Sequence, residues 1–328
     1  MQKIGITGAG FMGKMHAQVY KGLPGAELVG VFDHGSERAQ PFAEQFGIRT
    51  FSSLEELAEH CSVVDICTPT DTHAALTIAA ANLGLNVVCE KPMARTREEA
   101  AEMTKVCEEK GVRLFIAHCI RYWPEYVKLK ELNDSGELGA LLSVNLTRYG
   151  GFPAWSTDQW LRSEERAGGG VLDMHIHDTD YILYLLGEPD TMDTWGTLDE
   201  KGPSHVFTTM SYRGGKTIAH LEGGWNLPTG SPFKMAFRAV FEKGAVIWDN
   251  CPIGVYRPDA EPEFPEMVKI AAEGGGNLSD LGGYAAELAD FVDCLNTGRP
   301  CTVVTPQTSQ QSLDYVLKEI DQIKAKAG

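Results

Sequence analysis

The sequence predicts an α/β fold with two domains. The first is an N-terminal Rossmann domain with a doubly wound parallel sheet, and the second a C-terminal α/β domain with a large, mostly antiparallel open sheet. In the first third of the chain, short continuous apolar segments alternate with amphipathic helical segments, which is typical of a parallel sheet covered by helices on both faces. Beyond about residue 120, apolar residues alternate with polar ones, as at Met235, Phe237, Ala239 and Phe241. Such alternation indicates strands with one exposed face. We place the domain boundary between residues 120 and 121, giving domains 1–120 and 121–328.

The elements follow from these patterns. In the first domain we expect strands at 3–8, 27–33, 63–67, 86–90 and 112–116, with helices at about 12–22, 36–46, 72–84 and 95–110. In the second we expect strands at about 140–149, 191–198, 205–213, 216–225 and 234–242. A helix at 171–186 precedes most of these strands, and two more at about 284–296 and 307–325 close the chain.

Composition excludes several classes of protein. A net charge of −16 without a basic cluster argues against a nucleic-acid partner. Eight scattered cysteines without a C-x-x-C pair indicate reduced thiols rather than a disulfide framework. No apolar run approaches the ~20 residues of a membrane span, and a strand-like segment follows Met1 directly, without a signal peptide. We therefore expect a cytoplasmic protein.

The first motif predicts a dinucleotide site. Gly8-Ala9-Gly10-Phe11-Met12-Gly13 matches G-x-G-x-x-G and lies between a predicted strand and a predicted helix, which is the context that this motif requires. The first glycine permits the tight turn, the second lets the backbone approach a pyrophosphate, and the third allows close packing of helix and strand. The helix N-terminus then faces the phosphates.

Asp33 predicts which dinucleotide binds. It ends the second predicted strand, twenty residues after Gly13, where a carboxylate accepts hydrogen bonds from the ribose hydroxyls and repels a 2′-phosphate. We therefore expect NAD, with NADP the less favoured cofactor. Arg38 is the residue that would favour a 2′-phosphate, but it lies several residues into the next segment. Alternatively, Asp33 only caps the following helix.

Two further segments follow predicted strands and should lie at the carboxyl edge of the sheet, where ligands bind in such folds. Thr68, Pro69 and Thr70 follow the third strand and precede His73, and all four are expected at the cofactor; a plain helix-capping turn is the alternative. Glu90-Lys91-Pro92 follows the fourth strand, and Pro92 favours an extended backbone at Lys91. Taken alone, Lys91 would be a solvated surface residue.

A fourth segment places polar residues in a helix. Asp173-Met174-His175-Ile176-His177 follows three glycines and leads into an apolar helical stretch that ends at Gly187. As a helix it makes Asp173 and His177 i,i+4 neighbours and turns His175 away. As a strand it would present all three side chains on one face as metal ligands. The helical pattern favours the first interpretation, so no metal is expected.

Together these segments carry a family resemblance. The glycine motif, Glu90-Lys91-Pro92, the Asp173-x-x-x-His177 pair and the closing segment from Tyr284 to Pro300 resemble the glucose–fructose oxidoreductase and inositol dehydrogenase (Gfo/Idh/MocA) family across essentially the whole chain. The resemblance implies a Rossmann domain, a second domain with a large antiparallel sheet, and an active site between them.

The resemblance also implies roles. Lys91, Asp173 and His177 would be the catalytic residues: His177 as general base or acid, Lys91 as the group that holds the substrate oxygen and helps to place the nicotinamide, and Asp173 as the orienting carboxylate. A buried structural histidine is the alternative for His177. Glu90 would lie with Lys91 at the cofactor.

The chain departs from the family pattern at His175 and in the segment His118 to Trp123, so substrate preferences are not carried over. Aromatic rings stack on sugar C–H faces, and arginine and histidine bond hydroxyls. On that basis the candidate substrate residues are His118, Arg121, Tyr122, Trp155, Trp160 and Arg162.

The leading hypothesis is an NAD-dependent dehydrogenase or reductase of a sugar, sugar derivative or cyclitol. A second is a redox-neutral lyase or glycoside-cleaving enzyme that uses NAD transiently, and a third is a cofactor-binding regulator without catalysis. An open sheet with one bare face also predicts a homodimer or homotetramer joined through the second domain.

Overall fold

The computed structural model describes residues 1–34, 37–153, 156–228, 230–249, 251–268, 270 and 281–327, apart from the side chains of residues 157 and 158. These residues form two compact units. Unit 1 takes the described residues within Met1–Tyr122, Ser156–Trp160 and Lys269–Gln311, and unit 2 takes the remainder. The predicted boundary at 120–121 lies next to the point where unit 1 first ends. The predicted division into a cofactor domain and a substrate domain stays a prediction.

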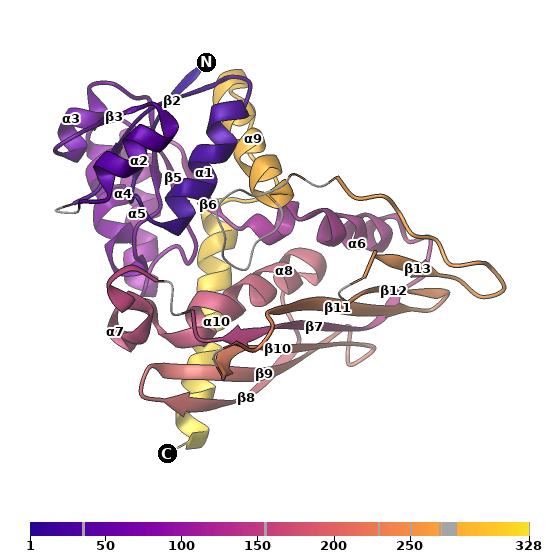
Figure 1. Cartoon of the computed structure of the whole chain (residues 1–328). Helices are drawn as coiled ribbons and strands as arrows, with labels where there is room; N and C mark the ends of the chain where they lie inside the picture. The colour runs from indigo at the N-terminus through magenta and orange to yellow at the C-terminus, as the bar shows by residue number, and fades with distance from the viewer. Residues whose placement is uncertain are drawn as a thin grey trace. The chain divides into compact units, whose positions relative to one another are not determined.

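Unit 1 is built on a six-stranded parallel sheet (Figure 1). The strands lie in the order β3-β2-β1-β4-β5-β6, and every neighbouring pair is parallel. Their bounds are β1 Gln2–Thr7, β2 Ala26–Phe32, β3 Arg49–Thr50, β4 Val63–Ile66, β5 Asn86–Glu90 and β6 Leu114–Ala117. This is the strand order of a Rossmann fold, and it confirms the predicted fold class of the N-terminal domain.

Helices connect these strands and lie where the sequence pattern predicts them. They are α1 Phe11–Gly22, α2 Ala39–Phe46, α4 His73–Asn82 and α5 Arg97–Lys110. The short α3 Leu54–Ala58 and strand β3 were not predicted, because five and two residues are too few to show a hydrophobic period. Two 3-10 turns, η1 Thr70–Thr72 and η2 Cys119–Tyr122, complete the first segment.

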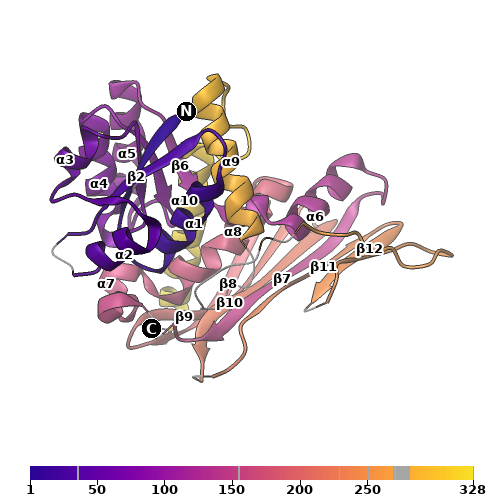
Figure 2. The ribbon, with the colours of Figure 1, turned by 45° about the horizontal axis from the view of Figure 1, so that its top comes forward.

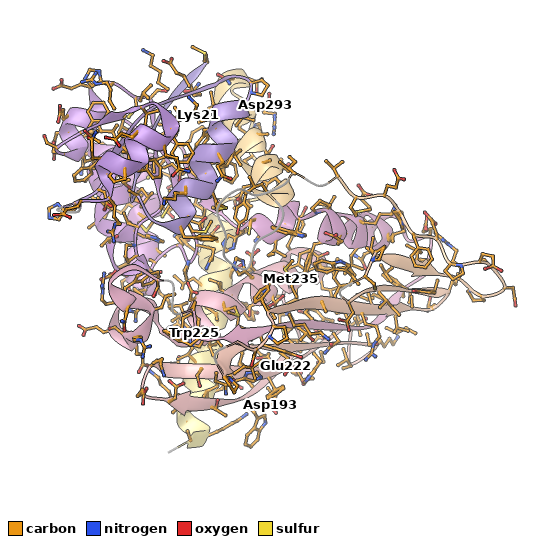
Figure 3. The ribbon with its side chains drawn as sticks, in the orientation of Figure 1. Lys21, Asp193, Glu222, Trp225, Met235 and Asp293 are labelled. Carbon is orange, nitrogen blue, oxygen red and sulfur yellow. The ribbon has the colours of Figure 1, made fainter. Side chains whose placement is uncertain are left out.

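Helix α9 Gly282–Thr297 belongs to unit 1 although it comes late in the chain. Its Phe291 stacks on Phe115 of β6 with 4.8 Å between the ring centroids, and Arg113 donates a hydrogen bond to the Cys294 carbonyl oxygen at 2.6 Å. Helix α9 also packs beside α1, and Lys21 and Asp293 mark these two helices in Figure 3.

Unit 2 is built on a seven-stranded sheet in the order β13-β12-β11-β7-β10-β9-β8 (Figure 2). Only the β10–β7 pair is parallel, and the other five pairs are antiparallel. The mostly antiparallel open sheet is therefore confirmed. The strands are β7 Leu141–Gly151, β8 Thr191–Asp199, β9 Gly202–Tyr212, β10 Thr217–Leu227, β11 Lys234–Phe241, β12 Gly244–Asp249 and β13 Gly254–Tyr256.

The two faces of this sheet differ. One face packs against helix α8 Ile176–Leu186 and the preceding turn η4 Val171–His175. The other face exposes Trp195, Phe207 and Ile218. Phe207 pairs with Trp195 on one side and with Glu222 on the other, and Glu222 and Asp193 are labelled on this sheet in Figure 3.

The other helices within the described ranges are α6 Pro124–Ser135, α7 Glu164–Ala167 and α10 Pro306–Ala327, with the 3-10 turn η3 Thr157–Arg162. Helix α6 was not predicted; Pro124 stands at its first turn, where proline favours helix initiation. Strands β12 and β13 were also missed. Within the described residues, we find no helix with the length and apolar character of a membrane span.

Candidate active site

The glycine motif forms the predicted turn at the end of β1. Gly8 has φ +97°, and a Cβ at this position would lie 2.7 Å from the Cys67 carbonyl oxygen. A Cβ on Gly13 would lie 2.1 Å from the Gly8 carbonyl oxygen, so Gly13 is required for α1 to pack on the turn. A Cβ on Gly10 would meet no atom within 4 Å. Gly10 is therefore not required by the packing of the protein itself.

Helix α1 begins at Phe11, with Gly10 at its N-cap and without a side-chain cap. The first N–H groups of such a helix carry a partial positive charge and bind phosphate readily. Gly10 leaves space beside these N–H groups. The turn and the helix terminus therefore fit the pyrophosphate of a dinucleotide.

Asp33 directly follows β2, as predicted, and forms an ion pair that the sequence did not reveal. Arg38 Nε lies 3.1 Å from Asp33 Oδ2. The Asp33 side chain is 8% exposed and the Arg38 side chain 38%. Arg38 therefore lies beside the carboxylate that the sequence predicts at the adenine ribose.

The Thr68–Pro69 turn follows β4 and continues into η1. Thr68 Oγ1 lies 2.6 Å from Thr72 Oγ1, and Thr70 is buried. His73 is also buried, with Nε2 2.9 Å from the Thr68 carbonyl oxygen and Nδ1 2.8 Å from the Pro92 carbonyl oxygen. His73 thus joins the turn after β4 to the turn after β5, whatever contact it makes with a cofactor.

Lys91 directly follows β5 and is half-buried. Its backbone N–H donates to Glu90 Oε2 at 3.1 Å, and Glu90 itself is 5% exposed. Burial would raise the pKa of Glu90, but contacts with His16, Lys91 and His73 outweigh burial, so this pKa is lowered. A charged carboxylate therefore lies behind the Lys91 turn.

Two residues that the sequence motifs did not reveal hold Glu90. His16 of α1 and Asp65 of β4 are both fully buried, and His16 lies between Asp65 and Glu90. Two signals could have revealed them. Asp65 is a charged residue inside the apolar strand Val63–Ile66, and His16 lies one helical turn after Gly13 among buried residues of α1.

Three candidate substrate residues of unit 1 are buried and structurally engaged. Arg121 donates to the Val303 carbonyl oxygen at 2.6 Å and to Thr308 Oγ1 at 3.2 Å. The Tyr122 hydroxyl donates to Asp290 Oδ2 at 2.6 Å. His118 is 1% exposed. These contacts account for Arg121 and Tyr122 without a substrate, and their predicted role in binding stays untested.

In unit 2 the Asp173–His177 segment is helical, as predicted, but its first turn is wider than an α-helix. Residues Val171–His175 form a π-helical turn, and α8 starts at Ile176. Such turns often occur at functional sites. Asp173 and His177 are both half-buried, so His177 is not sealed within the apolar core.

His175 is fully buried and turns toward the last helix. Its Nε2 lies 3.3 Å from Glu319 Oε1 of α10, and Thr179 donates to Glu319 Oε2 at 2.9 Å. A Cβ on Gly223 of β10 would come within 2.4 Å of His175 Nδ1. His175 therefore holds the π-helical turn between the sheet and α10, which explains a residue that sequence analysis could not assign.

Asp178, next to His177, fixes α8 to the sheet. Its carboxylate accepts hydrogen bonds from Arg148 Nε at 2.9 Å and from Arg148 Nη2 at 3.2 Å. Arg148 lies on β7 and also donates to the Tyr126 hydroxyl at 3.1 Å. All three residues are buried, so a charged pair inside unit 2 sets the position of the helix that carries His177.

The other aromatic candidates are only partly described. Trp155 lies outside the described residues, and Trp160 is half-buried. The guanidinium of Arg162 lies 5.0 Å from the centroid of the Phe152 ring, which in turn contacts Trp225 edge-on at 5.5 Å. Trp225 is labelled in Figure 3. Cation–π contact thus gives Arg162 a partner on the surface of unit 2.

Comparison with known proteins identifies the family. A sequence profile described as an oxidoreductase family with an NAD-binding Rossmann fold matches residues 2–118, and the Gfo/Idh/MocA C-terminal domain profile matches residues 126–247. The chain belongs to the Gfo/Idh/MocA family of NAD-binding oxidoreductases. The resemblance inferred from the sequence motifs is thereby confirmed.

Characterised family members act on different compounds. The chain is 34% identical to an inositol 2-dehydrogenase of Rhizobium meliloti, over 57% of this chain and 55% of that protein. It is 30% identical to a 2,7-anhydro-N-acetylneuraminate hydratase of Mediterraneibacter gnavus, over 76% of this chain and 67% of that protein. It spans less than two thirds of several curated relatives, with 63%, 55% and 54% as examples.

Several solved structures match nearly the whole chain. The UDP-N-acetylglucosamine 3-dehydrogenase of Acidithiobacillus ferrooxidans has a TM-score of 0.81 and 25% sequence identity, and the match covers 99% of this chain and 98% of that one. The similarity therefore includes both sheets of this Gfo/Idh/MocA member.

Proposed function

We propose that this protein is an NAD-dependent oxidoreductase that transfers a hydride between nicotinamide and a secondary alcohol or ketone carbon of a sugar, sugar derivative or cyclitol. The observation that supports it most strongly is the order of strands in unit 1. β1, β4 and β5 are neighbours in the sheet, and the glycine motif, the Thr68 turn and Lys91 follow their carboxyl ends. A cofactor turn and a candidate catalytic ammonium group therefore share one edge.

The residues present fit NAD. Gly8, Gly10 and Gly13, with the N-terminus of α1, would hold the pyrophosphate, and Asp33 would accept hydrogen bonds from the adenine ribose. The turn from Thr68 to Thr70, with His73, Glu90 and Lys91, completes the proposed cofactor set. When bound, NAD supplies a hydride acceptor, and its reduced form supplies a hydride donor.

The chain's own residues would handle the proton and the substrate oxygen. His177 takes the hydroxyl proton when the alcohol is oxidised and returns it in the reverse direction, since imidazole titrates near neutral pH. Lys91 holds the same oxygen and stabilises its developing negative charge. Asp173 orients the substrate and His177 by accepting hydrogen bonds.

A panel of sugars and cyclitols tests this function, with NADH formation and product identity measured separately. With an active substrate, we expect Lys91→Ala and His177→Ala to lower kcat by at least ~10²-fold, the usual scale for a positioned acid–base group. Lys105→Ala and His60→Ala are matched controls, because both residues are exposed and belong to none of the motifs. Near-normal turnover in the first two variants would remove the assignment.

A redox-neutral reaction is the second candidate, because some relatives are hydratases. In such a reaction, oxidation of one substrate carbon acidifies the neighbouring C–H, elimination or addition follows, and the final step restores the oxidised cofactor. Product formation without accumulation of NADH would support this candidate. A regulator without catalysis would have no use for Lys91, Asp173 and His177. It would form neither NADH nor product.

We also propose that the protein forms a homodimer or homotetramer through the bare face of the unit 2 sheet. On this face Trp195 is 59% exposed, Phe207 41% and Ile218 37%, and such apolar patches are typical of interfaces. The molecular mass from light scattering should be a multiple of the 35.8 kDa of one chain, and Phe207→Glu should lower this mass. A wild-type monomer would contradict the proposal.

A further inference from the structure

The strongest feature outside the proposed catalytic residues is a buried group of charges beneath the Lys91 turn. His16 Nδ1 lies 2.7 Å from Asp65 Oδ2, and His16 Nε2 lies 3.1 Å from Glu90 Oε1. The first contact is a direct hydrogen bond, and the second is an ion pair rather than a linear hydrogen bond. His16 and Asp65 have no solvent exposure. One imidazole therefore joins α1, β4 and β5 inside unit 1.

The surroundings of His16 favour its charged form. Burial alone would lower the pKa of His16. The contacts with Asp65 and Cys67 together raise it by more than burial lowers it, so this pKa lies well above its ordinary value. With both nitrogens protonated, the ring can donate to a carboxylate on each side. Other titratable groups also surround His16, Asp65 and Glu90. They come from α1, the turns after β4 and β5, η2 and α9, and they are Tyr20, Cys67, His73, Lys91, Cys119, Tyr284 and Glu287.

Glu90 links this group to the proposed catalytic lysine. One carboxylate oxygen faces His16, and the other accepts the backbone N–H of Lys91 at 3.1 Å. Because His16 restrains one oxygen of the Glu90 carboxylate, the other oxygen can restrain the backbone of the Lys91 turn. Charge-assisted contacts of this kind are shorter and stronger than neutral ones.

We propose that His16 is a positioning residue for Lys91: held by Asp65, it fixes the Glu90 carboxylate, which anchors the backbone of the Lys91 turn. The inference rests on the proposed role of Lys91. It assigns the two nitrogens of His16 different tasks. The Nδ1 contact with Asp65 stabilises the fold of unit 1, and the Nε2 contact with Glu90 places the catalytic turn.

Two isosteric substitutions separate these tasks. In His16→Asn the amide nitrogen takes the place of Nδ1 and keeps the donor to Asp65, but nothing reaches Glu90. In His16→Gln the amide nitrogen takes the place of Nε2 and keeps an N–H group facing the Glu90 carboxylate. If His16 positions the Lys91 turn, His16→Asn should lower kcat by about tenfold or more, since small misplacements of reacting groups are costly, whereas His16→Gln should retain most of kcat.

Hydrogen exchange gives a readout that needs neither cofactor nor substrate. In His16→Asn the Lys91 amide should exchange faster than in wild type, while amides of β1 and β4 keep their protection. In His16→Gln the Lys91 amide should stay protected, even if the melting temperature falls more. Loss of kcat and of Lys91 protection in proportion to global stability in both variants would overturn the proposal.

Glu90→Gln is a second route, should both His16 variants fail to fold. It keeps an oxygen for the Lys91 N–H but turns an amide NH2 group toward His16 Nε2. This group cannot accept the N–H of the ring, so the proposal predicts a lower kcat and a faster Lys91 amide. Unchanged values of both would contradict it. Absence of any turnover by wild type would instead count against the proposed function, while the exchange experiment would still decide on the role of His16.

Discussion

Each unit places a fully buried histidine behind a candidate catalytic segment, but the two histidines are held differently. In unit 1, His16 lies between two carboxylates on adjacent strands. In unit 2, His175 faces one carboxylate, Glu319, from the last helix of the chain. The Lys91 turn is thus supported by the ends of a parallel sheet, whereas the Asp173–His177 segment depends on the docking of α10 and on the Arg148–Asp178 pair. Local strand order supports the first segment, and contacts distant in sequence support the second.

We expect the largest effect from a substitution that removes the Arg148–Asp178 pair of unit 2. Arg148→Met leaves the Asp178 carboxylate buried without its cation, and uncompensated buried charges cost roughly 3–5 kcal/mol. Urea unfolding should show this loss in the free energy of unfolding. A change below ~1 kcal/mol would mean that the pair does not hold α8. Lys128→Met, at a partly exposed ion pair of α6, is the control, because such pairs contribute at most about 1 kcal/mol.

The second prediction concerns the glycine motif of unit 1. Gly13→Ala would place a Cβ 2.1 Å from the Gly8 carbonyl oxygen, so we expect loss of both stability and NAD binding. Gly10→Ala meets no protein atom and should fold normally yet bind NAD more weakly, because its methyl group lies where a phosphate would approach. Calorimetric titration with NAD and thermal unfolding separate the two cases. Equal NAD affinity in Gly10→Ala and wild type would contradict the proposed pyrophosphate site at the glycine motif.

The third prediction uses pH to compare the support in unit 1 with the rest of the protein. The pKa of His16 is raised on folding, so its stabilisation is full below the unfolded value of about 6.5 and is lost as pH rises through the folded pKa. The pKa of Glu90 is lowered, so its stabilisation is present above the unfolded value and is lost as pH falls through the folded one. The stability difference between wild type and His16→Gln should therefore shrink at alkaline pH. A difference that grows with rising pH would give the opposite sign and contradict a charged His16.

The outer features of the site could be predicted from the sequence, but the contacts among its buried supporting residues could not. The glycine turn, the Lys91 turn and the helix at His177 can each be recognised from a few consecutive residues. His16, Asp65 and Glu90 are far apart in sequence and meet only once β1, β4 and β5 pair. The same holds for His175 and Glu319, which are 144 positions apart. A local pattern can mark a single buried polar residue, as it does for Asp65 within an apolar strand, but it does not show which other residue that one contacts.

The smallest expected effect concerns the choice of cofactor. Asp33→Ala removes the carboxylate that we propose selects NAD, and it would release Arg38, which lies 3.1 Å from it, to pair with a 2′-phosphate. We expect the ratio of kcat/KM for NAD over NADP to fall by about tenfold, on the order of one charge-assisted hydrogen bond. In Asp33→Ala/Arg38→Ala the gain for NADP should disappear. An unchanged ratio in the single variant would remove Asp33 from cofactor selection.

Isotope transfer tests the central claim most directly. An active sugar or cyclitol that carries deuterium on its ring carbons is incubated with NAD and wild-type protein, and mass spectrometry then follows the label in the cofactor and in the product. A hydride transfer from a secondary alcohol predicts deuterium in NADH, in a one-to-one ratio with the ketone formed, and loss of both signals in His177→Ala. Turnover of the substrate with no deuterium passing through the nicotinamide at any time would contradict the account.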